Sequence, residues 1–182
     1  MKALVVYGTR KGATKQIAEE IGKVLGGQGY DVTVRDAKDM RGIDANIFDL
    51  IIVGSSVFAG MWKWQASRFL KKNEKKLSTK KVALFSSGLL GDDPANQKNM
   101  EEAGKVNAKV VAKVPAIRPL ALAYFGGCMT FTGGNFVTQF MANMLKKDYE
   151  KRGIDTSKPI DHRDWDAIRK WAADVGAKAK SA

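Results

Sequence analysis

Short apolar runs and amphipathic helical segments alternate along this chain, and that alternation limits the folds available to it more than any other feature. Five runs bounded by glycine or polar residues predict strands, at residues 2–7, 30–37, 48–56, 80–88 and 119–127. Apolar residues at helical spacing predict helices at about 14–25, 63–76, 95–113, 135–151 and 163–179. Repeated strand–helix units favour the α/β class, here a five-stranded parallel sheet with helices on both faces. We expect a single domain over residues 1–182.

Composition places the chain among globular proteins and narrows its chemistry. Hydrophobic residues make up 45% of its 182 positions and charged residues 27%, which suits a packed core and excludes a disordered chain. No apolar run reaches the roughly 20 residues that cross a bilayer, and the N-terminus lacks the form of a signal peptide, so we expect a cytoplasmic protein. The single cysteine, Cys128, and the single histidine, His162, argue against a metal site and against Cys/His or Ser/His/Asp catalysis. We expect Cys128 to fill space at a strand end and His162 to lie at the surface.

Net charge is the one unusual total. The chain carries +12 at pH 7 with a pI near 9.8, a balance that favours an anionic partner: nucleic acid, an anionic membrane surface or an acidic small molecule. Much of the charge comes from the lysine-rich residues 71–81, which would also suit a merely solvated face. No strand interleaves aromatic with basic residues and no recognition helix is evident, so we set nucleic acid aside.

The loop after the first predicted strand, "GTRKGAT" at residues 8–14, has the composition of a phosphate site. It lacks the Gly-x-x-x-x-Gly-Lys-Ser/Thr pattern of nucleoside triphosphatases and the Gly-x-Gly-x-x-Gly pattern of dinucleotide-binding domains. Two hydroxyls, a glycine that permits a tight turn and the amides of the following helix can still surround one phosphate. A plain strand–helix turn is the alternative. The candidate residues are Thr9, Arg10, Lys11, Gly12, Ala13 and Thr14.

Two further loops are expected at the same edge, since ligands of open α/β sheets lie outside the carboxyl ends of the strands. Large apolar residues beside glycine after the third strand suit a planar aromatic group, and the small residues after the fourth could bring amides to its edge. One phosphate loop with two loops around a flat ring indicates flavin mononucleotide (FMN) rather than ATP or NAD. The candidate residues in these loops are Ser55, Ser56, Val57, Phe58, Ala59, Gly60, Trp62, Ser86, Ser87, Gly88, Leu89, Leu90, Gly91 and Asp92. The alternative for Trp62 and Trp64 is that they begin a helix and pack on the core, which we favour for Trp64.

With Thr9–Thr14 in the place of a Thr/Ser-x-Thr-Gly-x-Thr phosphate loop, the chain resembles the flavodoxin-like family over nearly its whole length. The resemblance implies non-covalently bound FMN, with its phosphate on Thr9–Thr14 and its isoalloxazine ring between the loops at 55–62 and 86–92. Lys11 departs from the family pattern, because flavodoxins usually carry a hydroxyl residue there. Two roles remain open for Lys11: an ionic contact with the phosphate, or a side chain that faces water.

Within that family, the chain is similar to the menaquinone-dependent protoporphyrinogen oxidases. The similarity lies in "YGTRKGATKQIAEEI", in "VGSSVFAGMW" and in the chain after the fifth strand, where Asp164-Trp165 begins the last helix. It implies an inserted segment at about 128–160 and a flavin-dependent enzyme of heme biosynthesis that passes electrons from an organic substrate to a quinone. The segment departs at its start, where "MTFTGG" lacks the basic and aromatic residues that those enzymes often carry. The alternative is an electron-transfer flavodoxin, a carrier between protein partners.

The helix expected within that segment is amphipathic and basic. Its predicted apolar residues are Phe136, Val137, Phe140, Met141, Met144 and Leu145, and its basic end holds Lys146, Lys147, Lys151 and Arg152. Such a helix can make peripheral contact with the inner face of a membrane or cover an apolar cofactor. Packing against the sheet edge is the alternative. No acid–base residue stands out near the three loops, and because a flavin would carry the chemistry we name no catalytic residue. The sequence leaves the oligomeric state open.

Overall fold

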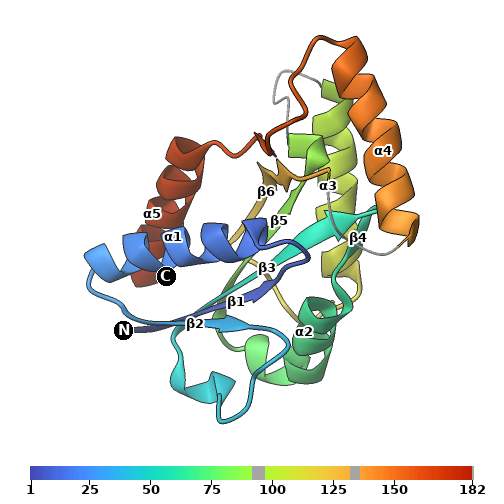
Figure 1. The fold of residues 1–182 in the computed structure, drawn as a ribbon. Helices are drawn as coiled ribbons and strands as arrows, with labels where there is room; N and C mark the ends of the chain where they lie inside the picture. Colours follow the sequence, from blue (N-terminus) through green and yellow to red (C-terminus); the bar gives the residue numbers. More distant parts are fainter. Residues whose placement is uncertain (92–96, 132–135, 182) are drawn as a thin grey trace.

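The computed structural model describes residues 1–91, 97–131 and 136–181 (Figure 1), so Asp92, one of the candidate residues above, lies outside the described part. The parallel strands are β1 (Lys2–Gly8), β2 (Asp31–Asp36), β3 (Leu50–Phe58), β5 (Lys81–Gly88) and β6 (Ala121–Gly126). The α-helices are α1 (Ala13–Gly27), α2 (Trp64–Leu77), α3 (Gln97–Ala112), α4 (Phe136–Lys151) and α5 (Trp165–Ser181). Shorter elements are β4 (Met61–Trp62), β7 (Cys128–Met129), β8 (Ile160–Asp161), and the 3-10 turns Ala45–Ile47 and Leu89–Gly91.

The five long strands form one sheet in the order β2-β1-β3-β5-β6, and each neighbouring pair is parallel. The expected α/β class and five-stranded parallel sheet are therefore confirmed. The order reverses at β1, which has β2 on one side and β3 on the other. In open α/β sheets, the crevice outside the carboxyl ends at such a reversal is where ligands bind.

Two apolar cores lie on opposite faces of the sheet, and adjacent strand residues separate into them. Val5 is completely buried in the core beneath α1 and α5, whereas Leu4 is completely buried in the core beneath α2 and α3. This separation follows from the two-residue period of a strand. Because helices cover both faces (Figure 1), the central strands are continuous apolar runs, the pattern from which they were predicted.

Each predicted long element ends within about two residues of the observed one. The structure adds β4, which pairs antiparallel with the end of β3 through Val57–Trp62 and Phe58–Met61. Ala59 and Gly60 join the two strands at φ 49° and 71°, the left-handed values of a two-residue hairpin turn.

Trp62, in the second strand of the hairpin, and Trp64, at the start of α2, differ in burial. Trp62 is only 7% exposed, whereas Trp64, expected to pack on the core, is 61% exposed, so that expectation is wrong. The physical reason is helical phase: α2 buries the face that carries Ala66 and Leu70, and Trp64 lies about 200° around the helix from Ala66.

The chain between β7 and β8 leaves the sheet edge and returns to it. β7 and β8 pair antiparallel, Cys128 with Asp161 and Met129 with Ile160, and α4 lies beyond the carboxyl ends of the sheet (Figure 1). Within the described ranges 1–91, 97–131 and 136–181, no helix combines the length and the apolar character needed to cross a membrane.

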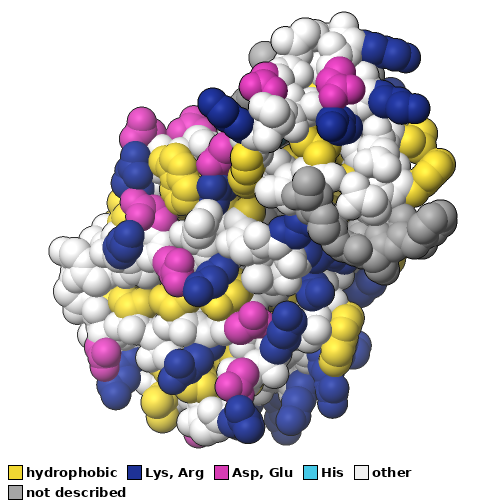
Figure 2. All heavy atoms as spheres, in the orientation of Figure 1, with side chains coloured by type: hydrophobic (Ala, Val, Ile, Leu, Met, Phe, Trp, Pro, Cys, Tyr) yellow, Lys and Arg dark blue, Asp and Glu magenta, His cyan; other side chains and the backbone are white. Residues whose placement is uncertain are grey.

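Lys and Arg side chains are spread over the face shown in Figure 2, among Asp and Glu, and they gather where Figure 1 places α2. The lysines of residues 71–76 are exposed, and Lys80 donates a hydrogen bond to the Asn46 carbonyl over 2.6 Å. The charge of this stretch therefore lies at the surface.

One close contact between strands gives a stability prediction. Gly54 of β3 lies opposite Phe85 of β5, and a Cβ at position 54 would overlap the phenyl ring. The ring cannot move freely, because Phe85 is completely buried with its centroid 5.8 Å from that of Phe125 and 6.2 Å from that of Trp171. We expect Gly54→Ala to lower the free energy of unfolding by about 1–3 kcal/mol in a urea titration.

The matched control is Gly104→Ala in α3, where nothing lies within 4 Å of an added Cβ. Replacing a helical glycine by alanine in open space should raise the free energy of unfolding by up to about 1 kcal/mol. Equal effects of the two substitutions would contradict the packing of Phe85 over Gly54.

Candidate functional site

The loops that follow β1, β3 and β5 enclose a cleft of about 400 Å³ at the carboxyl edge of the sheet. Strand register brings them together, since Gly8 lies opposite Ser55 and Ser56 lies opposite Ser87. The residues expected from the sequence that do line this cleft are Thr9, Arg10, Lys11, Ala13, Thr14, Ser56, Val57, Phe58, Ala59, Gly60, Ser87, Gly88, Leu89 and Leu90.

Seven lining residues were not expected from the sequence: Tyr124, Gly127, Cys128, Met129, Thr130, Ala142 and Leu145. They come from β6, from the chain just after it and from α4. The end of the fifth parallel strand was a usable signal for the first of them, because parallel strands end at one edge. The amphipathic pattern of 136–145 offered a helix that covers a cofactor as one alternative, with Leu145 on its apolar face, but Ala142 was not named, and only the way α4 folds back brings both residues to the cleft.

Ser55, Ser86 and Trp62, three of the candidate ring contacts, are buried and do not line the cleft. Both serines are completely buried. Gly12 does not line the cleft either. For Ser55 and Ser86 the cause is strand alternation: they point into the molecule from β3 and β5, whereas Ser56 and Ser87, one residue further on, line the cleft.

The candidate phosphate loop, Thr9–Thr14, forms a compact turn that leads into the start of α1. Gly12 has φ 95°, and its amide donates to Thr9 Oγ1 over 3.0 Å. Thr14 is 1% exposed, and its Oγ1 lies 2.9 Å from Ser87 Oγ, which joins this loop to the one after β5. No side chain caps α1. The first amides of α1 therefore have no intrahelical acceptor and give this end of the cleft a positive potential.

Arg10 and Lys11 connect the phosphate loop to other parts of the cleft. Arg10 donates from Nη1 to Ser56 Oγ over 3.1 Å and to the Ser56 carbonyl over 3.2 Å, and its guanidinium lies 5.2 Å from the Phe58 ring centre. Burial lowers the pKa of Arg10 from its ordinary value. Lys11 Nζ donates to the Thr130 carbonyl over 3.0 Å. Lys11 therefore holds the chain that follows β7, a role that neither sequence interpretation included.

A chain of buried hydrogen bonds supports the loops from below. Trp62 Nε1 donates to Ser86 Oγ over 2.7 Å, Ser86 Oγ donates to Asn107 Oδ1 over 2.6 Å, and Asn107 Nδ2 donates to the Ala123 carbonyl over 3.2 Å. Nearby, Ser55 Oγ accepts from the Lys63 amide over 2.8 Å. These bonds join β4, β5, α3 and β6 below the loops that follow β3 and β5.

The helix α4 covers the cleft with one face and exposes another. Ala142 and Leu145 line the cleft, whereas Phe140 and Met144 are each 60% exposed. Leu145, Phe140 and Met144 were expected on one apolar face, and the helix divides them between two directions. The described part of α4 therefore covers the cleft and leaves an apolar strip facing solvent.

The base of the segment that carries α4 is held by polar and aromatic contacts. Tyr149 packs between Phe131 and His162, with ring centroids 6.0 Å from each, and its hydroxyl lies 3.2 Å from His162 Nε2. His162 is therefore half-buried against Tyr149 and not fully at the surface. Cys128 lies on β7 in the cleft wall, where burial raises the pKa of its thiol.

A charged contact fastens β8 to α1. Arg163 pairs with Asp161 and donates from Nη1 to Gln16 Oε1 over 2.5 Å. The hydrogen bond from Arg163 holds the pKa of the Asp161 carboxyl below its usual range. No cluster of His, Cys, Asp or Glu able to hold a metal ion occurs in the part of the chain that the structure describes.

Comparisons with known proteins agree on one family. A model of the flavodoxin domain matches residues 4–156. Over 175 residues the chain is 22% identical to "Protoporphyrinogen IX dehydrogenase [quinone]" of Escherichia coli (strain K12), covering 96% of this chain and 94% of that protein. A flavodoxin from the domain Archaea matches with a TM-score of 0.57 at 20% identity over 99% of both chains. A flavoprotein in complex with FMN from Lactobacillus acidophilus NCFM matches with a TM-score of 0.51 at 18% identity, over 68% of this chain and 92% of that one.

The buried network gives the prediction for this site. Ser86→Ala removes the acceptor of the Trp62 indole N–H and the donor to Asn107, and burial leaves both groups without water. We expect the free energy of unfolding to fall by about 1–3 kcal/mol in a urea titration. In a Trp62→Phe background, Ser86→Ala should lower the free energy of unfolding by measurably less, because the indole N–H that would lose its acceptor is already absent. Additive effects of the two substitutions would contradict the coupling.

Proposed function

This chain belongs to the flavodoxin family, and from that premise we propose that its cleft binds FMN and that the protein is a flavin-dependent oxidoreductase. The observation that carries the proposal is that one cleft has a positively polarised end and an apolar end. One end is the uncapped start of α1 with the Thr9–Thr14 loop, and the other is an apolar wall formed by Val57, Phe58, Leu89 and Leu90. A phosphate on a flat aromatic ring suits that pair of environments.

In this proposal the chain's own groups bind and orient the cofactor, and FMN supplies a ring that takes up and releases electrons. The α1 amides hold the phosphate, and Thr14, tied to Ser87, keeps the phosphate loop at a fixed distance from the ring loops. Arg10 fixes Phe58 and Ser56 from the side. Ala142 and Leu145 limit the access of water to the cleft on the side that α4 covers.

We infer an enzyme that takes electrons from an organic substrate of the protoporphyrinogen type and passes them to a quinone. Support comes from the near end-to-end match to a protein named for that activity. It also comes from the chain between β7 and β8, which we interpret as a segment inserted at about 128–160. Its α4 narrows access to the cleft, a feature that suits selection of a small substrate.

A carrier that exchanges electrons with protein partners is the second candidate, favoured by solved relatives that are named as flavodoxins. The exposed strip of Phe140 and Met144, with Lys147 exposed on the same helix, favours the first candidate. Apolar and basic side chains together suit peripheral contact with an anionic membrane, the phase in which a quinone acceptor dissolves. We therefore place the protein in the cytoplasm, at the inner face of the membrane.

The FMN site is tested by placing a negative charge where the phosphate should lie. Ala13→Asp introduces a carboxylate at the start of α1, a position where Asp favours the helix, so the fold should be retained. At about 5 Å and an effective dielectric constant near 20, repulsion of the phosphate corresponds to a loss of at least about 100-fold in FMN affinity. The measurement is quenching of FMN fluorescence during titration.

The matched control is Ala167→Asp, the same substitution in the first turn of α5 and away from the cleft. It should bind FMN as tightly as the unmodified chain. Riboflavin, which lacks the phosphate, should bind weakly to all three proteins. A chain that fails to bind FMN, or an Ala13→Asp variant that binds it normally, would overturn the assignment of the cleft.

The enzyme and carrier proposals separate in a turnover assay. The FMN-loaded chain should oxidise protoporphyrinogen when a menaquinone analogue is supplied, and much more slowly without it. Leu145→Gln should lower that turnover severalfold while FMN stays bound, since Leu145 lines the covered side of the cleft. Lys147→Gln, an exposed change on the same helix, is the control. Electron exchange with a reductase but no turnover with any quinone would identify a carrier.

A further inference from the structure

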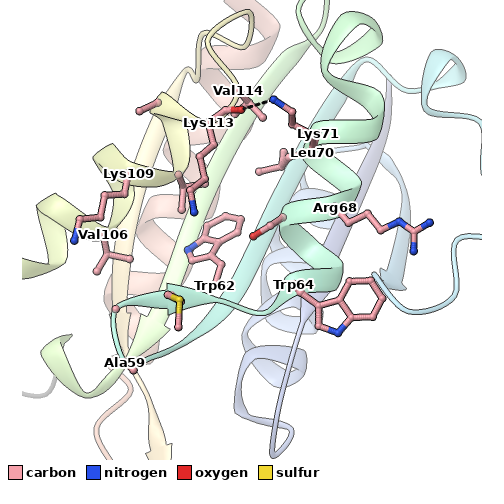
Figure 3. A pocket seen from close by; sticks show the side chains of 15 residues that line it. Ala59, Trp62, Trp64, Arg68, Leu70, Lys71, Val106, Lys109, Lys113 and Val114 are labelled. Carbon is pink, nitrogen blue, oxygen red and sulfur yellow. Dashed lines mark hydrogen bonds between the residues drawn. The ribbon is translucent and has the colours of Figure 1, made fainter.

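A second cavity, of about 720 Å³, lies between α2 and α3 and is separate from the FMN cleft (Figure 3). Among the described lining residues, the two cavities share Ala59 and Gly60, whose turn forms a wall of each. The proposed function does not use this groove, and none of the residues Thr9–Thr14 lines it. Its volume falls in the range of small-molecule sites, roughly 300–1,000 Å³.

The floor of the groove is apolar. Trp62, Leu70, Val106 and Val114 form it, and each of them is less than a tenth exposed. Figure 3 shows the Trp62 indole between the side chains of α2 and α3. Since the indole N–H is already bonded to Ser86 Oγ beneath it, the ring offers the groove an apolar surface.

The banks of the groove are cationic. Lys71 extends from α2 across the groove, where its Nζ donates to the carbonyl of Lys113, the residue after α3, over 3.4 Å (Figure 3). Arg68 of α2 and Lys109 of α3 border the groove but extend outward from it, and the Arg68 guanidinium lies 5.8 Å from the Trp64 ring centre. No Asp or Glu is among its described lining residues. Two acids of the same helices are engaged elsewhere: Glu74 accepts from the Ala116 amide over 3.1 Å, and Glu102 pairs with Lys105 over 2.6 Å. Basic side chains on both sides therefore border an apolar floor, and no acidic side chain is among the described lining residues.

We propose that this groove binds an amphipathic organic anion: a small molecule with a flat or extended apolar body that carries one or more carboxylates. An inorganic anion would leave the Trp62 floor unused. A neutral apolar molecule would leave the basic residues that border the groove without a counter-charge. An amphipathic carboxylate meets both requirements. Basic side chains at the groove can reach its carboxylate, while their aliphatic parts and the apolar floor cover its apolar body.

Occupancy of the groove is connected to the cofactor site by covalent and hydrogen-bonded structure. Trp62 bonds to Ser86, and the next residue, Ser87, lines the FMN cleft. The Ala59–Gly60 turn touches both cavities. A ligand against Trp62 is therefore adjacent to the cleft without entering it, and its binding does not require that FMN be present.

The test uses pyrenebutyrate, a flat apolar group with one carboxylate, titrated into the full-length chain by calorimetry with and without saturating FMN. We expect one binding site in both samples. Pyrenebutanol, which has the same ring without the charge, and butyrate, which has the charge without the ring, should each bind at least tenfold more weakly. Energy transfer from tryptophan to pyrene should accompany binding, because Trp62 and Trp64 lie at the groove.

The matched variants change the same net charge at different places. The double variant Lys109→Gln/Lys113→Gln removes one bank and should weaken pyrenebutyrate binding at least tenfold, while FMN binding is unchanged. Lys72→Gln/Lys75→Gln, exposed on α2 and outside the groove, should bind as the unmodified chain does. These lysines are exposed, so all the variants should fold, and circular dichroism checks that they do.

Four outcomes would overturn the proposal. Equal losses in the two double variants would mean attraction by net charge alone. Pyrenebutanol binding as tightly as pyrenebutyrate would remove the role of the cations. Displacement of pyrenebutyrate by FMN would place it in the cleft and not in the groove. An acidic amphipathic helical peptide that binds the groove while pyrenebutyrate does not would assign the surface to a protein partner instead.

Discussion

The parallel register of β1, β3 and β5 is the constraint on which the rest of this structure depends. Gly8 lies opposite Ser55, and Ser56 lies opposite Ser87, so these strands end at one level and their loops begin together. A shift of one residue would exchange the buried and exposed sides of a strand and break both cores. Packing beneath the loops maintains this register, because Phe85 has room only where its neighbour in β3 is a glycine.

The hairpin formed by β3 and β4 separates two cavities with different linings near the carboxyl edge of the sheet. On one side is the cleft with the uncapped helix start, and on the other is the groove floored by Trp62. The turn is strained, since Ala59 has φ 49°, a value that costs a residue with a Cβ roughly 1–2 kcal/mol. Strain of this size persists only where the surrounding structure holds it, here by strand pairing and the Trp62–Ser86 bond.

The large positive charge of the chain is unevenly matched by acids. Many described ion pairs are exposed, such as Lys170–Asp174 and Arg41–Asp39, and pairs of this kind contribute about 0–1 kcal/mol each. At the groove between α2 and α3 the described lining residues include four cations and no acid, and there we propose that the positive potential favours an anionic ligand. Charge is therefore informative about this protein at particular places and not as a total.

The sequence by itself determined the class of the fold, the strands and helices to within about two residues, and most of the cleft, because periodicity and strand ends are local properties. It could not distinguish Ser55 from Ser56 as a lining residue, since which neighbour points outward depends on how each strand ends against its partners. For Leu145 it left three alternatives open, a membrane surface, a cofactor or the sheet edge, and only the way α4 folds back brings this residue to the cleft. Tertiary structure alone decided these features and the cationic groove, because each joins residues far apart in the chain through packing that no local pattern records.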